Sequence, residues 1–226
     1  MSHQQPTHPA DPSPRPRRRR GGLLAVLTGL VGVVILALSM NSTVAAFTAS
    51  ITNSVNSAGA GTLIMREQNA AGTVTCLSTD GAANNVTNNA ATCTTINKYG
   101  GATTVVPGQT VSTTVTITNV GTAPASTFTL APGTCTQSGN VTGSATDLCS
   151  RLGIVITQTV GGTSTTVSPA SSTLATLATA GPITLSSPVP PNTTITFTFA
   201  VTLAAAAGNT YQGLAASQPL VWTFTS

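Results

Sequence analysis

Cysteine is the residue type in this sequence whose spacing says most about chemistry. Cys76, Cys93, Cys135 and Cys149 all lie downstream of a long apolar segment, and no two of them are spaced as Cys-x-x-Cys. That spacing is typical of zinc sites, so its absence and the even number of cysteines favour disulfide bonds formed outside the cytosol. Four cysteines allow three pairings, all of which stay open here. The local pairing joins Cys76 to Cys93 and Cys135 to Cys149.

Histidine and carboxylate residues offer little for catalysis. His3 and His8 both precede the apolar segment, and the acidic residues after it are Glu67, Asp80 and Asp147. Without a downstream histidine, that part of the chain cannot build a Ser-His-Asp or Cys-His site, or a His-Glu-x-x-His zinc site. We expect Glu67 to be a solvated charge at a strand end, and the two aspartates to belong to turns. The sequence therefore predicts no catalytic residue, cofactor or metal ligand, and a protein that is not an enzyme.

Three further side chains could bind a ligand, but each has a structural explanation. Lys98 and Tyr99 stand before two glycines, which is typical of an ordinary turn. Trp222 lies in an alternating apolar segment near the C-terminus, and we expect it to pack in a core.

Basic residues are concentrated at the N-terminus. Five of the eight lie between Arg15 and Arg20, whereas the chain from Ala46 onward has three basic and three acidic residues. The basic run is a targeting signal rather than a nucleic-acid site, so nucleic acid is not expected as a partner. A surface with so few charges tolerates self-association.

The first 45 residues have the organisation of an export signal. Residues 1–21 are polar and basic, and residues 22–45 hold an apolar block followed by small residues. This order predicts a signal peptide cut between Ala45 and Ala46, or one residue later. An uncleaved membrane anchor over residues 22–40 is the alternative, and the only way in which this chain would contact a membrane. Both readings place the rest of the protein outside the cell, secreted or at its surface.

Apolar residues alternate with threonine through most of the remaining chain, which is the pattern of half-buried strands. The clearest run is residues 194–203, and residues 111–117, 154–159 and 220–224 repeat it. Gly161-Gly162 predicts a hairpin turn, and residues 174–180 predict a short helical turn or an edge strand. We therefore expect an all-β fold after an N-terminal signal or anchor helix. Residues 46–62 would be an arm or first strand, and residues 63–226 an antiparallel β-sandwich of jelly-roll or immunoglobulin-like type.

Three stretches of the sequence resemble one family of exported proteins. They are STVAAFTASITNSVNSAGAGTL at residues 42–63, TITNVGTAPASTFTL at 116–130 and GNTYQGLAASQPLVWTFTS at 208–226. The first looks like the leader junction of proteins processed by the signal peptidase SipW. The other two are similar to an Asn-x-Gly turn and to the closing segment of the same group. This is the family of TasA and camelysin, with many actinobacterial relatives.

The resemblance implies a jelly-roll-like subunit of fibres in the biofilm matrix or on the cell surface. In such fibres the N-terminal arm of one subunit completes a sheet of the next. Here the arm would be residues 46–55, with Phe47, Ala49 and Ile51 pointing inward. Self-association or contact with other surface proteins would follow.

Other readings of the sequence stay open. The arm could fold back as the first strand of its own domain. The protein could instead be a monomeric cell-surface binding or adhesion module that uses loops such as residues 81–92. A hydrolase or peptidase is the third reading. Camelysin-type relatives have been labelled metalloproteases, a label that this chain fits poorly because no exported histidine is available to hold zinc.

Processing of the leader is directly testable. N-terminal sequencing of the exported protein should give Ala46 as the first residue, because the small residues before it suit a signal peptidase. A start at Phe47 would fit the alternative cut. An exported protein that still contains residues 22–40 would contradict cleavage and support the anchor.

Overall fold

The computed structural model describes residues 27–35, 50–51, 56–80, 89–102, 104–138 and 143–226. The chain divides into two units, Met1–Ser57 and Ala58–Ser226. In the first unit, residues 27–35 are helical. Among the described residues, no helix has both the length and the apolar character needed to cross a membrane. Ala45, Ala46, Phe47 and Ala49, which carry the predicted cleavage site and most of the arm, lie outside the described residues.

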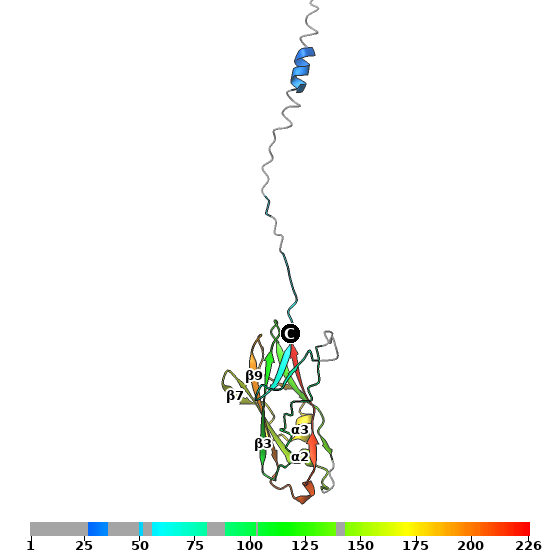
Figure 1. Cartoon of the computed structure of the whole chain (residues 1–226), viewed down its shortest axis with the longest axis vertical. Helices are drawn as coiled ribbons and strands as arrows, with labels where there is room; N and C mark the ends of the chain where they lie inside the picture. The colour runs from blue at the N-terminus through cyan, green and yellow to red at the C-terminus, as the bar shows by residue number, and fades with distance from the viewer. Residues whose placement is uncertain (1–26, 36–49, 52–55, 81–88, 103, 139–142) are drawn as a thin grey trace, which may run out of the picture. The chain divides into compact units, whose positions relative to one another are not determined.

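The second unit is mostly β-structure with antiparallel sheets, as the alternating pattern predicts. Its largest sheet has the strand order β2-β1-β3-β9-β6-β7. The strands are β1 (Met65–Asn69), β2 (Thr75–Leu77), β3 (Thr110–Asn119), β6 (Leu152–Val160), β7 (Thr163–Thr166) and β9 (Thr194–Leu203). The long strands β3 and β9 run alongside each other (Figure 1). The hairpin predicted at Gly161-Gly162 is confirmed, because it joins β6 to β7.

Two smaller sheets and three short helices complete this unit. The three-stranded sheet has the order β11-β4-β8, from β4 (Thr127–Pro132), β8 (Ile183–Thr184) and β11 (Leu220–Thr225). The two-stranded sheet pairs β5 (Thr136–Ser138) with β10 (Ala215–Ser217). The helices are α2 (Leu148–Arg151), α3 (Leu174–Thr179) and the 3-10 helix η1 (Asn209–Tyr211). Of the two alternatives for residues 174–180, the helical one is correct: Thr173 and Thr176 form a capping box at its start.

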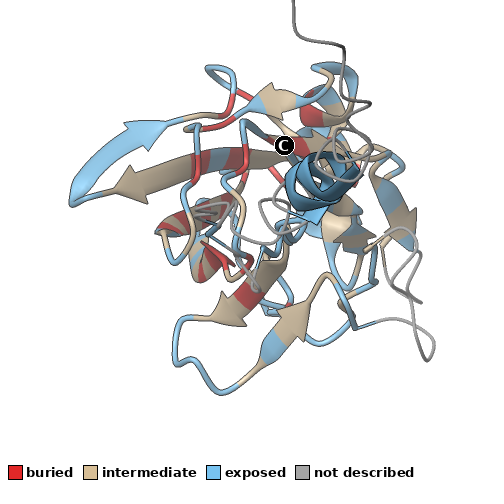
Figure 2. Cartoon of the chain, turned by 90° about the horizontal axis from the view of Figure 1, so that it is seen from above, coloured by how far each residue is buried: buried red, intermediate tan, exposed pale blue. Residues whose placement is uncertain are grey.

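Period-two alternation along the central strands builds the core. In β9 every second residue is buried, from Ile195 to Leu203, while the threonines between them face outward. Buried residues therefore appear as bands along the strands in Figure 2. Ile154 and Ile156 of β6 are buried in the same way, whereas Val155 between them is 48% exposed. This sheet therefore has one apolar face and one hydroxyl-rich face, as the sequence predicts.

Aromatic side chains join the three-stranded sheet to the six-stranded sheet. Phe128 of β4 and Phe197 of β9 meet edge to face, with ring centroids 5.7 Å apart. Trp222 of β11 contacts both rings, at centroid distances of 5.6 and 4.6 Å. Each such pair contributes about 0.5–1.5 kcal/mol beyond the burial of its area. The second unit therefore has a core shared by two sheets.

Threonine hydroxyls cross-link the outer face of the six-stranded sheet. Pairs from β3 and β9 lie within hydrogen-bond distance, namely Thr110–Thr202 at 2.7 Å, Thr118–Thr194 at 2.9 Å and Thr114–Thr198 at 3.3 Å. Cross-strand pairs of this kind stabilise a sheet by about 0.2–1 kcal/mol each. The abundant threonine thus has a structural role on this face.

The turn after β3 depends on a buried asparagine and on a glycine. The side chain of Asn119 is fully buried and donates hydrogen bonds to the carbonyl oxygens of Ala123 and Val189, both at 2.9 Å. Its own oxygen accepts a bond from the backbone of Gly121. The chain entering β1 lies directly against this turn, and a methyl group on Gly121 would collide with the carbonyl oxygen of Thr62. Residue 121 therefore has to be glycine.

Replacement of that glycine should destabilise the domain measurably. We expect Gly121→Ala to lower the free energy of unfolding by about 1–3 kcal/mol, the usual cost of overpacking. The matched control is Gly208→Ala, since an added methyl group at Gly208 meets no atom within 4 Å. Urea denaturation followed by circular dichroism measures both. Equal stability of the two variants would contradict this account of the turn.

Candidate functional site

The described residues of the second unit form a groove of about 1600 Å³. Its lining comes from β11 and the residues just before it, from β1 and the irregular segment 89–102, and also from β9, β10 and η1. Representative lining residues are Leu63, Met65, Glu67, Ile96, Leu220 and Trp222. More of the lining is apolar than polar.

Strand β11 forms one wall of this groove and is an edge strand. It is hydrogen-bonded to β4 along its whole length, from Leu220 opposite Pro132 to Thr225 opposite Thr127. Among the described residues, no strand pairs with its other side. Val221 and Thr223, whose side chains point away from the core, also line the groove, and Val221 is 56% exposed. None of the six β11 residues is charged, so the strand lacks the lysine or glutamate that commonly protects an edge.

Trp222 has the core position that its alternating strand predicts. Its ring packs against three buried phenylalanines, Phe128, Phe197 and Phe199. Its Nε1 atom is buried and has no hydrogen-bond partner among the described residues. A buried donor without an acceptor costs about 1–3 kcal/mol, so the domain bears an unfavourable contact beside this groove.

A buried ion pair also lines the groove and corrects one prediction. Glu67 was expected to be a solvated strand-end charge; instead it faces the interior between the sheets and is 6% exposed. Its Oε1 atom lies 2.7 Å from Nζ of Lys98. Lys98 and Tyr99 do occupy a turn, as predicted, but Lys98 also has this second role. The residues of β1, Met-Arg-Glu-Gln-Asn, show no apolar alternation that could have indicated the inward direction of Glu67.

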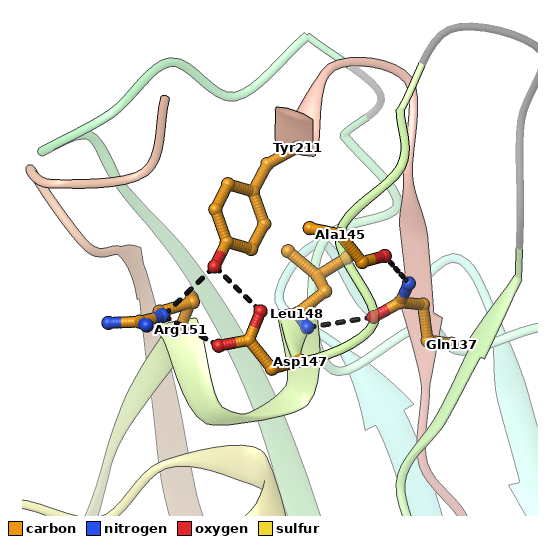
Figure 3. A network of polar contacts seen from close by, with 6 residues as sticks. All are labelled: Gln137, Ala145, Asp147, Leu148, Arg151 and Tyr211. Carbon is orange, nitrogen blue, oxygen red and sulfur yellow. Dashed lines mark hydrogen bonds and ion pairs between the residues drawn. The ribbon is translucent and has the colours of Figure 1, made fainter. Parts of the chain in front are cut away.

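The other ion pair lies outside the groove, in the network of Figure 3. Tyr211 donates a hydrogen bond to Asp147 at 2.6 Å, and Arg151 Nε contacts the same carboxylate at 2.9 Å. The bond from Tyr211, followed by that from Arg151, holds the pKa of Asp147 below its usual range. Asp147 therefore stabilises the fold above the unfolded carboxyl pKa of about 3.9, and this contribution is lost as pH falls through the folded value.

This network differs from the turn expected at Asp147. Asp147 is the residue before α2, yet its side chain makes no capping hydrogen bond to that helix. The neighbouring Gln137 side chain instead binds the backbone of Leu148 and Ala145, as Figure 3 shows. Together these contacts attach the closing segment around η1 to α2. Their role is structural.

The structure has two disulfide bonds, and of the three pairings it has the local one. Cys76 is bonded to Cys93, and Cys135 to Cys149. Two disulfides are typical of proteins that fold in an oxidising compartment. Asp80 forms the predicted turn, accepting a hydrogen bond from the backbone of Leu77 at 2.6 Å. Each of the three carboxylates thus has its own hydrogen-bonding or ionic partner: Lys98 for Glu67, the backbone of Leu77 for Asp80, and Tyr211 with Arg151 for Asp147.

The arm is described only in part. Ile51, one of its three predicted inward residues, is 95% exposed. Residues 50–51 and 56–64 contain no strand, and the first strand begins at Met65. Residues 62–64 run beside the turn after β3, where Thr62 O accepts from the backbone of Thr122 at 2.8 Å.

The buried ion pair should be much more sensitive to mutation than the exposed one. Lys98→Met leaves a buried carboxylate without a partner, so we expect a loss of about 3–5 kcal/mol in the free energy of unfolding. The double variant Glu67→Leu, Lys98→Met should recover most of that loss, because no buried charge remains. Urea denaturation measures both.

The matched control is Arg151→Met. The side chains of Arg151 and Asp147 are 46% and 43% exposed, so we expect a loss below about 1 kcal/mol. A Lys98→Met variant no less stable than Arg151→Met would show that the Glu67–Lys98 pair has no special importance.

No protein-family model matches this chain, and no curated protein matches it.

Proposed function

We propose that this chain is an exported structural protein of the cell surface or biofilm matrix, and a fibre subunit that assembles by strand addition. The acceptor is β11 with its groove, and the donor is the arm, residues 46–55, of a second copy. In this proposal the two packed sheets form a jelly-roll-like or immunoglobulin-like sandwich. The similarity of the three quoted stretches to TasA and camelysin supports the same role.

The observation that carries the proposal is the free, uncharged edge of β11 beside an apolar groove. An unpaired edge exposes backbone donors and acceptors that favour pairing with another chain. Natural β-proteins usually protect such edges with charges, prolines or very short strands. The six residues of β11 have none of these features. Added strands in protein complexes bind through these backbone bonds and place alternate side chains in pockets.

The arm has the composition that such an acceptor requires. Residues 46–55 contain no charged residue, so burial in an apolar groove carries no cost for charge removal. Phe47, Ala49 and Ile51 recur with period two and would face the groove together. At about 3.4 Å per residue, ten residues are more than long enough to pair with the six residues of β11.

The remaining chemistry supports a structural role rather than an enzymatic one. The exported part has no histidine, and each of its carboxylates has a local partner. Two disulfides suit a protein that works outside the cell. Low charge suits subunits that associate.

A charge on the edge of β11 should prevent assembly without unfolding the domain. We expect Val221→Lys to abolish filaments, because Val221 is exposed and lines the groove. The matched control is Val155→Lys, since Val155 is similarly exposed but lies on β6, between β9 and β7 in the six-stranded sheet. Electron microscopy and size-exclusion chromatography of the exported protein would compare them with the unmodified chain.

Deletion of residues 46–55 should have the same effect as Val221→Lys, since the donor is then missing. Filaments that persist without these residues, or that form equally in the two lysine variants, would contradict strand addition at β11. An unmodified protein that stays monomeric would contradict the fibre and favour the surface-binding module.

A further inference from the structure

The irregular segment 89–102, which we call the strap, supplies many of the residues that line the groove. It contains no strand, yet Ile96 is only 8% exposed and belongs to the main core. Thr95 and Asn97 on either side of Ile96 are exposed. Among the other described residues of the strap, only Cys93 and Tyr99 also pack against this core, so the strap has few apolar contacts and its position depends on further attachments.

Two attachments fasten the strap to the six-stranded sheet. Cys93 is bonded to Cys76 of β2, and Lys98 is paired with Glu67 of β1 at 2.7 Å. At its C-terminal end the strap also packs closely against β3. Gly100 has a φ of +79° and lies so near β3 that an added methyl group would be 2.8 Å from the Val111 side chain.

A third attachment reaches toward the other sheet. The hydroxyl of Tyr99 donates a hydrogen bond of 2.7 Å to Oε1 of Gln218, two residues before β11. Nε2 of Gln218 in turn donates to the carbonyl oxygens of Gly133, at 2.8 Å, and Leu174, at 3.0 Å. Burial raises the pKa of Tyr99, so its hydroxyl keeps the proton used in this contact. The strap therefore connects β1 and β2 to the start of the strand that we propose as acceptor.

We infer that the Cys76–Cys93 disulfide pre-organises the groove for the arm by holding the strap in place. This inference rests on the proposed function, and it names the part of the chain that controls docking. With the disulfide present, Cys93 cannot leave β2, and the ion pair and the Tyr99 contact are close to their partners. Without it, the strap keeps only its noncovalent contacts, among them the ion pair, the Tyr99 contact and the hydrogen bonds of Asn89 with Ser78 and Leu63. It then leaves its place in a fraction of the molecules, and the arm binds only those in which the groove is formed. Apparent affinity falls in proportion to that fraction.

The test uses residues 58–226, which form a compact unit with its own core and both disulfides. This protein lacks the arm, so a synthetic peptide of residues 46–55 serves as donor. Trp222, the only tryptophan of the chain, lines the groove and reports binding by its fluorescence. The variant carries Cys76→Ser and Cys93→Ser together. The matched control carries Cys135→Ser and Cys149→Ser, which removes a disulfide of similar loop length whose cysteines do not line the groove.

We expect the first variant to bind the peptide about tenfold more weakly, which corresponds to a strap that is in place in about one tenth of the molecules. We expect the control to bind the peptide as tightly as the unmodified protein does. Should the first variant not fold, Tyr99→Phe tests the same strap with both disulfides intact, and weaker binding is again expected. Equal binding by the unmodified protein and the folded strap variant overturns the role of the strap and leaves strand addition standing. No binding by any form overturns strand addition itself, and the inference with it.

Discussion

The contact on which the rest of the structure depends is the aromatic packing between the two larger sheets. Phe128, Phe197 and Trp222 bring the three-stranded sheet against β9, and so determine where β11 lies. Strand β11 is paired with β4 on one side and anchored by the packing of its own Trp222 on Phe197 and Phe199, and its other edge has no paired strand among the described residues. Aromatic contacts of this kind contribute packing energy but supply no backbone partner. The packing that stabilises the domain thus leaves the backbone groups on one edge of β11 without a partner strand.

The chain has so few charged residues that the role of most of them can be described individually. Two of the three cations after residue 45 are paired with carboxylates, one inside the domain and one at its surface. The inner pair, Glu67 and Lys98, positions the strap, and the outer pair joins α2 to the closing segment through Tyr211. Because burial removes solvent screening, we expect the loss of one partner to destabilise the domain much more in the inner pair than in the outer pair. None of these charges belongs to β11, so this edge lacks a charged gatekeeper of its own.

Much of the fold could be predicted from period-two patterns, whereas the groove could not. The buried faces of β9 and β6 could be predicted because successive side chains of a pleated strand point to opposite sides. These faces include the alternate residues from Ile195 to Leu203 and from Ile154 to Ile156. Sheet order, and the side of β11 that stays open, depend on contacts between residues far apart in the chain. The inward direction of Glu67 was missed because a charge next to Arg66 suggests solvent, and its partner Lys98 lies 31 residues away, in a segment without periodicity. Gln218 shows the same difficulty, since its three contacts come from distant segments.

Strand addition requires that β11 pair with a strand from a second copy of the chain. Electron cryomicroscopy of the assembled exported protein can observe this pairing directly. The account predicts a strand hydrogen-bonded to the free side of β11, built from residues 46–55 of a neighbouring copy, with Phe47, Ala49 and Ile51 in the groove. Filaments in which β11 keeps an unpaired edge, or in which each arm pairs within its own domain, would contradict it.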